Sequence, residues 1–97
     1  MLIPIIIVAT VHVKEGNMEK AKEALKEMVP KIKESEPGLL EYIPHTVKQD
    51  PNAIMFYEKY ADGDAMKQHM ANLPKNMEKF SPLLERGMDV KNLDEIV

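Results

Sequence analysis

The side chains most able to carry out chemistry gather between His45 and Phe80. This stretch contains two of the three histidines, two of the three tyrosines and both phenylalanines of the chain. A histidine can take a proton from a phenol near neutral pH, and a carboxylate among aromatic side chains either gains a raised pKa or pairs with a basic group. The residue types therefore favour proton transfer at a hydroxyl of a small apolar molecule.

One face of a strand expected over residues 53–60 collects three of these groups. Side chains alternate between the two faces of a strand, so Phe56, Glu58 and Tyr60 share one face. Glu58 is expected either to act in proton transfer or to form a structural pair that fixes a helix against the sheet. Phe56 and Tyr60 are expected to contact a substrate, and Tyr60 can offer it a hydroxyl.

Two histidines are candidates for the general base. His69 lies in an amphipathic segment, at a spacing from Ala65 and Met66 that turns it toward the core. It can act as a base or satisfy a buried carboxylate, and both interpretations stay open. His45 lies on an earlier strand, where it faces either the same pocket or a dimer partner. His12 is expected at the surface or at a sheet edge.

The sequence predicts no metal site and no bound cofactor. The histidines lack HxH or HExxH spacing, and the chain has no cysteine to supply a thiolate or a disulfide. Eight methionines, Met66 among them, predict an adaptable apolar lining that either fills the core or accepts a flat hydrophobic ligand. Tyr42 is expected to orient such a ligand through its hydroxyl or simply to bury its ring.

Composition narrows the class of protein. A length of 97 residues suits one domain over residues 1–97, and a net charge of −3 argues against a nucleic-acid surface. The first residues, MLIPIIIVATVHV, lack a basic start and a cleavage site and are too short to span a bilayer. We interpret them as a buried strand, and we expect a cytoplasmic protein without nucleic-acid or membrane partners.

The pattern of apolar residues predicts an α+β fold with an antiparallel sheet, in the ferredoxin-like order βαββαβ. Residues 5–8 are all apolar and must point to both faces of that sheet, so the face away from the helices also needs cover. A second copy supplies it most economically, and we predict a homodimer. The predicted elements are a strand within residues 1–13, a helix over 17–35, strands over 39–47 and 53–60 joined by a longer turn at 48–52, a short helix between 64 and 73, and a final strand with an extension at about 87–97.

Capping and breaking residues set the expected ends of the two helices. Asn17 is a good N-cap for the first helix, and Asp62 or Asp64 for the second. Pro30 predicts a kink or an irregular last turn, because it lacks an N–H and its ring clashes with the preceding turn. The second helix is expected to break at residues 73–74 for the same reason.

Five features between residues 36 and 69 carry a family resemblance. They are the run EPGLLEY at 36–42, His45, the turn DPN at 50–52, the strand FYEKY at 56–60 and the helical His69. In this order and spacing they resemble the antibiotic biosynthesis monooxygenase domain. The resemblance implies a dimeric α+β barrel with a pocket between sheet and helices. Some members of that family oxidise quinols or polyphenols with dioxygen without metal or flavin, and others isomerise small molecules or degrade haem.

By this resemblance the substrate is a small aromatic, quinol-like molecule and the oxidant is dioxygen. His69 or His45 would be the general base, Glu58 would orient it, and Tyr60 would hold the substrate. No cofactor is implied, since the residues of the haem-degrading branch are not matched and Lys79 stands where that branch has a histidine. Tyr60 stands where the family usually has tryptophan. The alternatives are an isomerase of the same fold and a non-catalytic dimeric ligand-binding or stress protein.

Overall fold

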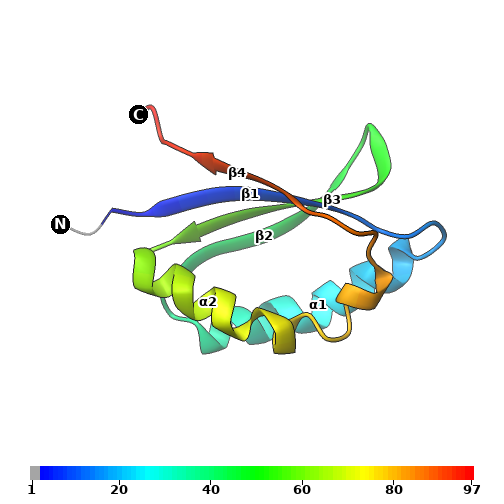
Figure 1. The fold of residues 1–97 in the computed structure, drawn as a ribbon, viewed down its shortest axis with the longest axis horizontal. Coiled ribbons are helices and arrows are strands. Elements are labelled where there is room, and N and C mark those ends of the chain that lie inside the picture. The colour runs from blue at the N-terminus through cyan, green and yellow to red at the C-terminus, as the bar shows by residue number, and fades with distance from the viewer. Residues whose placement is uncertain (1–2) are drawn as a thin grey trace.

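A four-stranded antiparallel sheet is covered on one face by two helices (Figure 1). The structure is a computed structural model, and it describes residues 3–97. The order confirms the predicted ferredoxin-like βαββαβ fold. The elements are β1 (Ile5–His12), α1 (Met18–Ser35), β2 (Leu39–Val47), β3 (Asp50–Tyr60), α2 (Gly63–Asn76), the short 3₁₀ helix η1 (Ser81–Leu83) and β4 (Asp89–Leu93).

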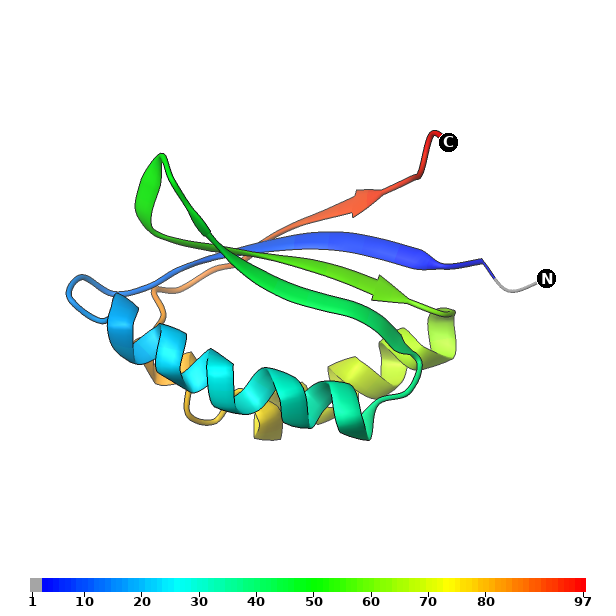
Figure 2. The ribbon, with the colours of Figure 1, turned by 180° about the vertical axis from the view of Figure 1, so that it is seen from behind.

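The strands lie in the order β2-β3-β1-β4, so β2 and β4 form the two edges. Seen from behind, both helices lie on the same side of the sheet (Figure 2). The register places Glu58 of β3 between Ile7 of β1 and Tyr42 of β2. Side chains in one row of a sheet point to the same face. These three side chains therefore all point toward the helices.

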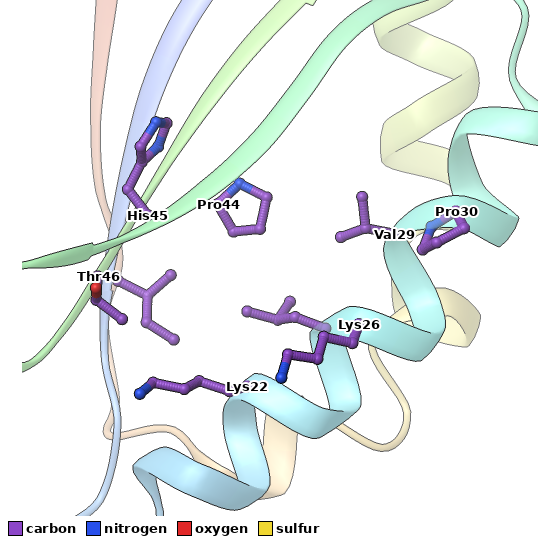
Figure 3. Close-up of a pocket in the computed structure, with 9 residues that line it drawn as sticks. Lys22, Lys26, Val29, Pro30, Pro44, His45 and Thr46 are labelled. Carbon is purple, nitrogen blue, oxygen red and sulfur yellow. The ribbon is translucent and has the colours of Figure 1, made fainter.

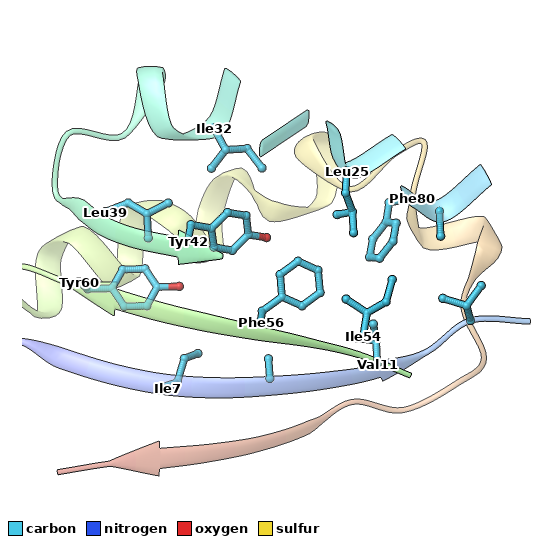
Figure 4. Packing of buried hydrophobic residues seen from close by; sticks show 13 residues of the cluster. Ile7, Val11, Leu25, Ile32, Leu39, Tyr42, Ile54, Phe56, Tyr60 and Phe80 are labelled. Carbon is cyan, nitrogen blue, oxygen red and sulfur yellow. The ribbon is translucent and has the colours of Figure 1, made fainter. Parts of the chain in front are cut away.

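The hydrophobic core fills the space between the sheet and the helices (Figure 4). Phe56 lies at its centre, stacked on Tyr42 with ring centroids 5.5 Å apart and edge-on to Phe80 at 6.0 Å. Aromatic pairs at these separations add to the free energy gained by burying the rings. Because Phe80 is fully buried, the segment that follows α2 is fixed to the core.

The hairpin between β2 and β3 is tighter than predicted. We expected a turn over residues 48–52, but β3 begins at Asp50 and only Lys48 and Gln49 separate the strands. The carbonyl of Asn52 accepts a hydrogen bond from the backbone N–H of Val13, at 2.7 Å. Val13 directly follows β1, and Asp50 pairs with Val47 of β2, so β3 extends beyond the predicted start at Ala53.

Helix α1 follows the prediction closely, with one difference at its start. It runs without interruption through Pro30 to Ser35. Asn17 stands at the N-cap position, but its side chain makes no capping hydrogen bond. Its amide nitrogen donates instead to the carbonyl of Glu15, at 3.1 Å, and so stabilises the preceding turn.

Helix α2 is longer than predicted. Asp62 is its N-cap, and the carboxylate accepts a hydrogen bond from the backbone N–H of Ala65 at 2.9 Å. The expected break at 73–74 is wrong, because the helix includes Pro74 and ends at Asn76. A proline this close to the end of a helix removes only one of its last backbone hydrogen bonds. Met77, the residue after the end of the helix, still donates its N–H to the carbonyl of Leu73 at 2.8 Å.

The sheet face away from the helices is open and partly apolar. Ile43 of β2 is 40% exposed and Met55 of β3 is 37% exposed, and both point to this face by strand alternation. Every residue of the edge strand β4 is exposed, and Leu93 adds a further apolar side chain. Within residues 3–97 no helix has both the length and the apolar character needed to cross a membrane.

Gly38 lies where the loop after α1 approaches α2. A Cβ atom at this position would lie 2.6 Å from the Cβ of Ala65, closer than side-chain carbons pack. We expect Gly38→Ala to lower the free energy of unfolding by about 1–3 kcal/mol through overpacking. Gly63→Ala is the matched control, because no atom lies within 4 Å of its Cβ and alanine favours helix. Urea denaturation compares the two, and an equal effect would contradict the close approach of the loop to α2.

Candidate functional site

A histidine lies buried between two carboxylates, beneath the middle of the sheet. His69 of α2 is 1% exposed. Its Nδ1 lies 2.8 Å from Oε1 of Glu36, and its Nε2 lies 3.8 Å from Oε1 of Glu58. The hydroxyl of Tyr60 donates a hydrogen bond to the same oxygen of Glu58. We refer to these four residues, Glu36, His69, Glu58 and Tyr60, as the buried cluster.

Three elements position the buried cluster. Glu36 is the C-cap of α1, where its backbone N–H donates to the carbonyl of Ile32 at 3.0 Å. Glu58 and Tyr60 lie two residues apart on β3 and so point to the same face, as strand alternation predicts. His69 lies one helical turn after Ala65, on the side of α2 that faces the sheet.

Glu36 was not predicted as a site residue. In the sequence it is one of many glutamates, and nothing local separates it from the charged face of α1. Its side chain is buried by residues that are distant from it in the sequence. His69 contacts Oε1 of Glu36, and the amide nitrogen of Asn76 donates to Oε2 at 3.3 Å.

The structure brings most of the predicted site residues together. The ring of Tyr42 lies edge-on to that of His69, with centroids 5.2 Å apart. Phe56 stacks on Tyr42, and Met66 is half-buried against the hydrophobic core. Figure 4 shows the hydroxyls of Tyr42 and Tyr60 pointing the same way along the core.

His45 lies apart from the buried cluster. It is an exposed residue of β2, and its Nδ1 lies 3.3 Å from the backbone carbonyl oxygen of Met55 on the neighbouring strand. Strand alternation turns its side chain to the face opposite Tyr42 and the helices. His45 therefore does not contact the cavity beside His69.

A cavity of about 70 Å³ lies beside the buried cluster, between the sheet and α2. Within residues 3–97, three lining residues have polar side chains, namely Glu58, His69 and Tyr42, and the rest of the lining is apolar. The volume is far below the roughly 300–1,000 Å³ of pockets for drug-sized ligands. Four of the lining residues are methionines, whose unbranched side chains adapt readily to new shapes. They are Met66, Met70, Met77 and Met88.

Burial controls the protonation of the groups around this cavity. It raises the pKa of Glu58 above its ordinary value, while the hydrogen bond from Tyr60 and the neighbouring His69 partly oppose this effect. Burial and the nearby Glu58 carboxylate also raise the pKa values of Tyr42 and Tyr60 well above that of a free phenol. Both tyrosines therefore keep their protons at neutral pH, and the hydroxyl of Tyr60 donates to Glu58.

The sequence of the chain as a whole matches a known protein family. Residues 4–80 match the sequence family described as antibiotic biosynthesis monooxygenase. The chain belongs to this family. Its membership supports a function as a monooxygenase, or a related function found in this family. A comparison with curated proteins finds no match to the sequence.

Solved structures with the antibiotic biosynthesis monooxygenase fold superpose on nearly the whole chain. A candidate monooxygenase of this family from Caulobacter crescentus CB15 is 24% identical, with a TM-score of 0.85 over 97% of this chain and 91% of its own. Another, from Bacteroides thetaiotaomicron VPI-5482, is 22% identical, with a TM-score of 0.83 over 97% and 90%. A conserved protein from Methanosarcina mazei Go1 is 17% identical, with a TM-score of 0.81 over 95% and 92%. At these identities the likeness shows the fold alone.

The raised pKa of Glu58 predicts a pH-dependent stability. The ordinary pKa of a glutamate is 4.5. At pH values above it, the folded protein keeps the Glu58 proton more firmly than the unfolded chain does. The free energy of unfolding should therefore fall as the pH rises from about 4.5 through the raised pKa. Glu58→Gln removes this titration but keeps an oxygen that accepts from Tyr60, so its pH dependence should be flatter. Urea denaturation at four pH values between 4.5 and 7.5 measures the difference.

Glu27→Gln is the control for this experiment. Glu27 is an exposed glutamate of α1, and the nearby charge of Lys79 lowers its pKa. Its contribution to stability is complete above pH 4.5 and is lost only as the pH falls below that value. Glu27→Gln should therefore leave the slope between pH 4.5 and 7.5 unchanged. The same slope in Glu58→Gln and in the unaltered protein would contradict the assignment to Glu58.

Proposed function

We propose that this protein is a cofactor-independent monooxygenase that oxidises a small quinol or polyphenol with dioxygen. The observation that supports it best is His69, held between two carboxylates at the wall of an apolar cavity. In the proposed reaction a quinol and dioxygen give a hydroxyquinone and water. One oxygen atom enters the ring and the other leaves as water, and all four electrons come from the quinol.

The general base in this proposal is Nε2 of His69. Glu36 is a carboxylate that accepts a hydrogen bond from Nδ1, so Nδ1 carries the proton and Nε2 keeps its lone pair. Nε2 faces Glu58 and the cavity, where it can take the proton of a substrate hydroxyl. The two carboxylates stabilise the imidazolium that forms, and the apolar lining keeps water from the substrate anion.

The size of the cavity favours small substrates. At about 70 Å³ it cannot enclose an aromatic ring unless the lining side chains move. Met70 and Met88 are both exposed, and their displacement would open the cavity toward solvent. We therefore propose that the substrate is a quinol with a single ring, in preference to one with two fused rings.

We further propose that the chain acts as a homodimer, packed sheet to sheet. The exposed Ile43 and Met55 on the open face support this assembly, because buried apolar surface drives association. Size-exclusion chromatography with light scattering tests it. A monomer at micromolar concentration would contradict the proposal, and Met55→Lys should shift a dimer toward monomer.

A non-catalytic ligand-binding role is the second candidate. Within residues 3–97, every buried side-chain nitrogen and oxygen has a hydrogen-bond partner. A buried, hydrogen-bonded cluster can also serve to fix α2 against the sheet, with no part in a reaction.

Dioxygen uptake decides between these candidates. Metal-stripped protein is incubated with hydroquinone, methylhydroquinone or menadiol, and the rate is compared with autoxidation of the quinol alone. The monooxygenase proposal expects uptake above this blank and one hydroxyquinone for each dioxygen consumed. Turnover without dioxygen would instead indicate an isomerase. Saturable binding without uptake on any quinol would support the non-catalytic role.

A further inference from the structure

A second, larger cavity lies at the opposite edge of the sheet, between α1 and the edge strand β2 (Figure 3). Its volume is about 360 Å³, within the roughly 300–1,000 Å³ of small-molecule sites. Val29 and Pro30 of α1 and Pro44 of β2 form its walls, and the core residues Leu25 and Ile54 also line it. We refer to it as the α1–β2 groove.

Positive charge is confined to one part of the α1–β2 groove. Lys22 and Lys26 line it one helical turn apart, and both project from the α1 side in Figure 3. Within residues 3–97, no aspartate or glutamate lines the groove. The lysines pair with Glu19 and Glu23 at 3.3 and 3.4 Å, but these glutamates are exposed. Exposed pairs are weak, so the lysines can turn to a ligand at little cost.

The α1–β2 groove is therefore amphipathic along its length. On α1 its lining extends from Lys22 to Pro30, which corresponds to about 12 Å at 1.5 Å per residue. The lysines stand toward the start of the helix, and Val29, Pro30 and Pro44 give the other end an apolar surface. A volume of about 360 Å³ holds on the order of twelve groups the size of water, about 30 Å³ each. Methylene groups are of similar size.

We propose that the α1–β2 groove binds a medium-chain fatty carboxylate of about eight to twelve carbons. The carboxylate lies against Lys22 and Lys26, and the alkyl chain lies against Val29 and Pro44. Among residues 3–97, none lines both this groove and the cavity beside His69. His45 also lines the groove, but its ring points away from α1 (Figure 3). The proposal is thus independent of the proposed oxygenase activity.

Titration of the ¹³C-labelled protein with decanoate, followed by methyl resonances, tests the proposal. Saturable shifts are expected at Leu25, Val29 and Ile54, and not at methyl groups of the cavity beside His69. Decan-1-ol has the same chain without the charge and should bind several-fold more weakly. The double variant Lys22→Ala/Lys26→Ala should weaken decanoate binding about three- to tenfold, since each lysine makes an exposed charge contact.

Two further variants test whether the ligand occupies the α1–β2 groove. Thr46→Trp changes an exposed residue that lines the α1–β2 groove, so it should obstruct the alkyl chain and weaken binding at least tenfold without disturbing the core. Lys33→Ala removes an exposed lysine of the same helix outside the groove and should leave binding unchanged. Absence of saturable shifts, or equal effects of the Lys33 and double-lysine variants, would overturn the proposal. If the resonances at the groove change on dilution of the protein and not on addition of decanoate, the groove binds a second copy of the chain, and the proposal is wrong.

Discussion

Replacing His69 by alanine should lower kcat for quinol oxidation by about 10²–10⁴-fold, the usual contribution of a positioned general base. The imidazole lies at the cavity wall with Nε2 turned toward Glu58, and no other histidine contacts this cavity among residues 3–97. Dioxygen uptake with the best quinol of the panel measures the loss. Added imidazole should restore part of the rate in His69→Ala, because the truncated side chain leaves room for it.

Two variants separate catalysis from folding. His69→Asn keeps an N–H near the position of Nδ1 that can donate to Glu36, but it has no basic nitrogen. It should remain folded and be as inactive as His69→Ala. His45→Ala changes an exposed side chain away from the cavity and should keep the full rate. A comparable loss in His45→Ala, or full activity in His69→Asn, would rule out His69 as the base.

Glu36→Ala should lower the free energy of unfolding by about 2–5 kcal/mol. Two donors lose their acceptor in this variant, namely the buried Nδ1–H of His69 and the half-buried amide of Asn76. An unsatisfied buried donor costs about 1–3 kcal/mol. Urea denaturation at neutral pH measures the change. Glu34→Ala is the matched control, because Glu34 is an exposed glutamate of the same helix and its loss should cost less than about 0.5 kcal/mol.

Glu36→Gln distinguishes a structural from a positioning role. Glutamine keeps an oxygen that accepts from Nδ1–H of His69, and the amide of Asn76 can reverse to accept from glutamine. Most of the stability should therefore return. The neutral amide stabilises an imidazolium less than a carboxylate does, so kcat should stay at least about tenfold reduced. Nitrogen chemical shifts of His69 report the tautomer in each variant, and full activity in Glu36→Gln would leave Glu36 a structural residue only.

The sequence predicts the fold well because the fold depends on regular patterns. Strand alternation places Phe56, Glu58 and Tyr60 on one face, and helical spacing turns His69 inward, as the structure confirms. Rules based on single residues, such as the helix-breaking effect of proline, predict the ends of helices and strands less accurately. Pro74 does not end its helix, since the backbone bonds that follow it can form without its N–H.

Contacts between distant residues set the limit of sequence reasoning. Glu36 and His69 are 33 positions apart, and only the packing of the α1 terminus against α2 brings them together. The exposure of His45 has a similar origin. Its strand was predicted correctly, but which face of that strand meets the helices depends on pairing with β3.

The strand that closes the cavity beside His69 is also the one held least firmly. All of β4 is exposed, and Val90 of this strand lines the cavity. In the part of the chain that the structure describes, β4 pairs only with β1. Exposed edges open locally at a small fraction of the free energy needed to unfold a domain. Transient detachment of β4 would admit solvent or a ligand to His69 while β1, β3 and the core stay intact. Amide exchange should therefore be fast at Val90 and slow at Ile7, even though both residues line the same cavity.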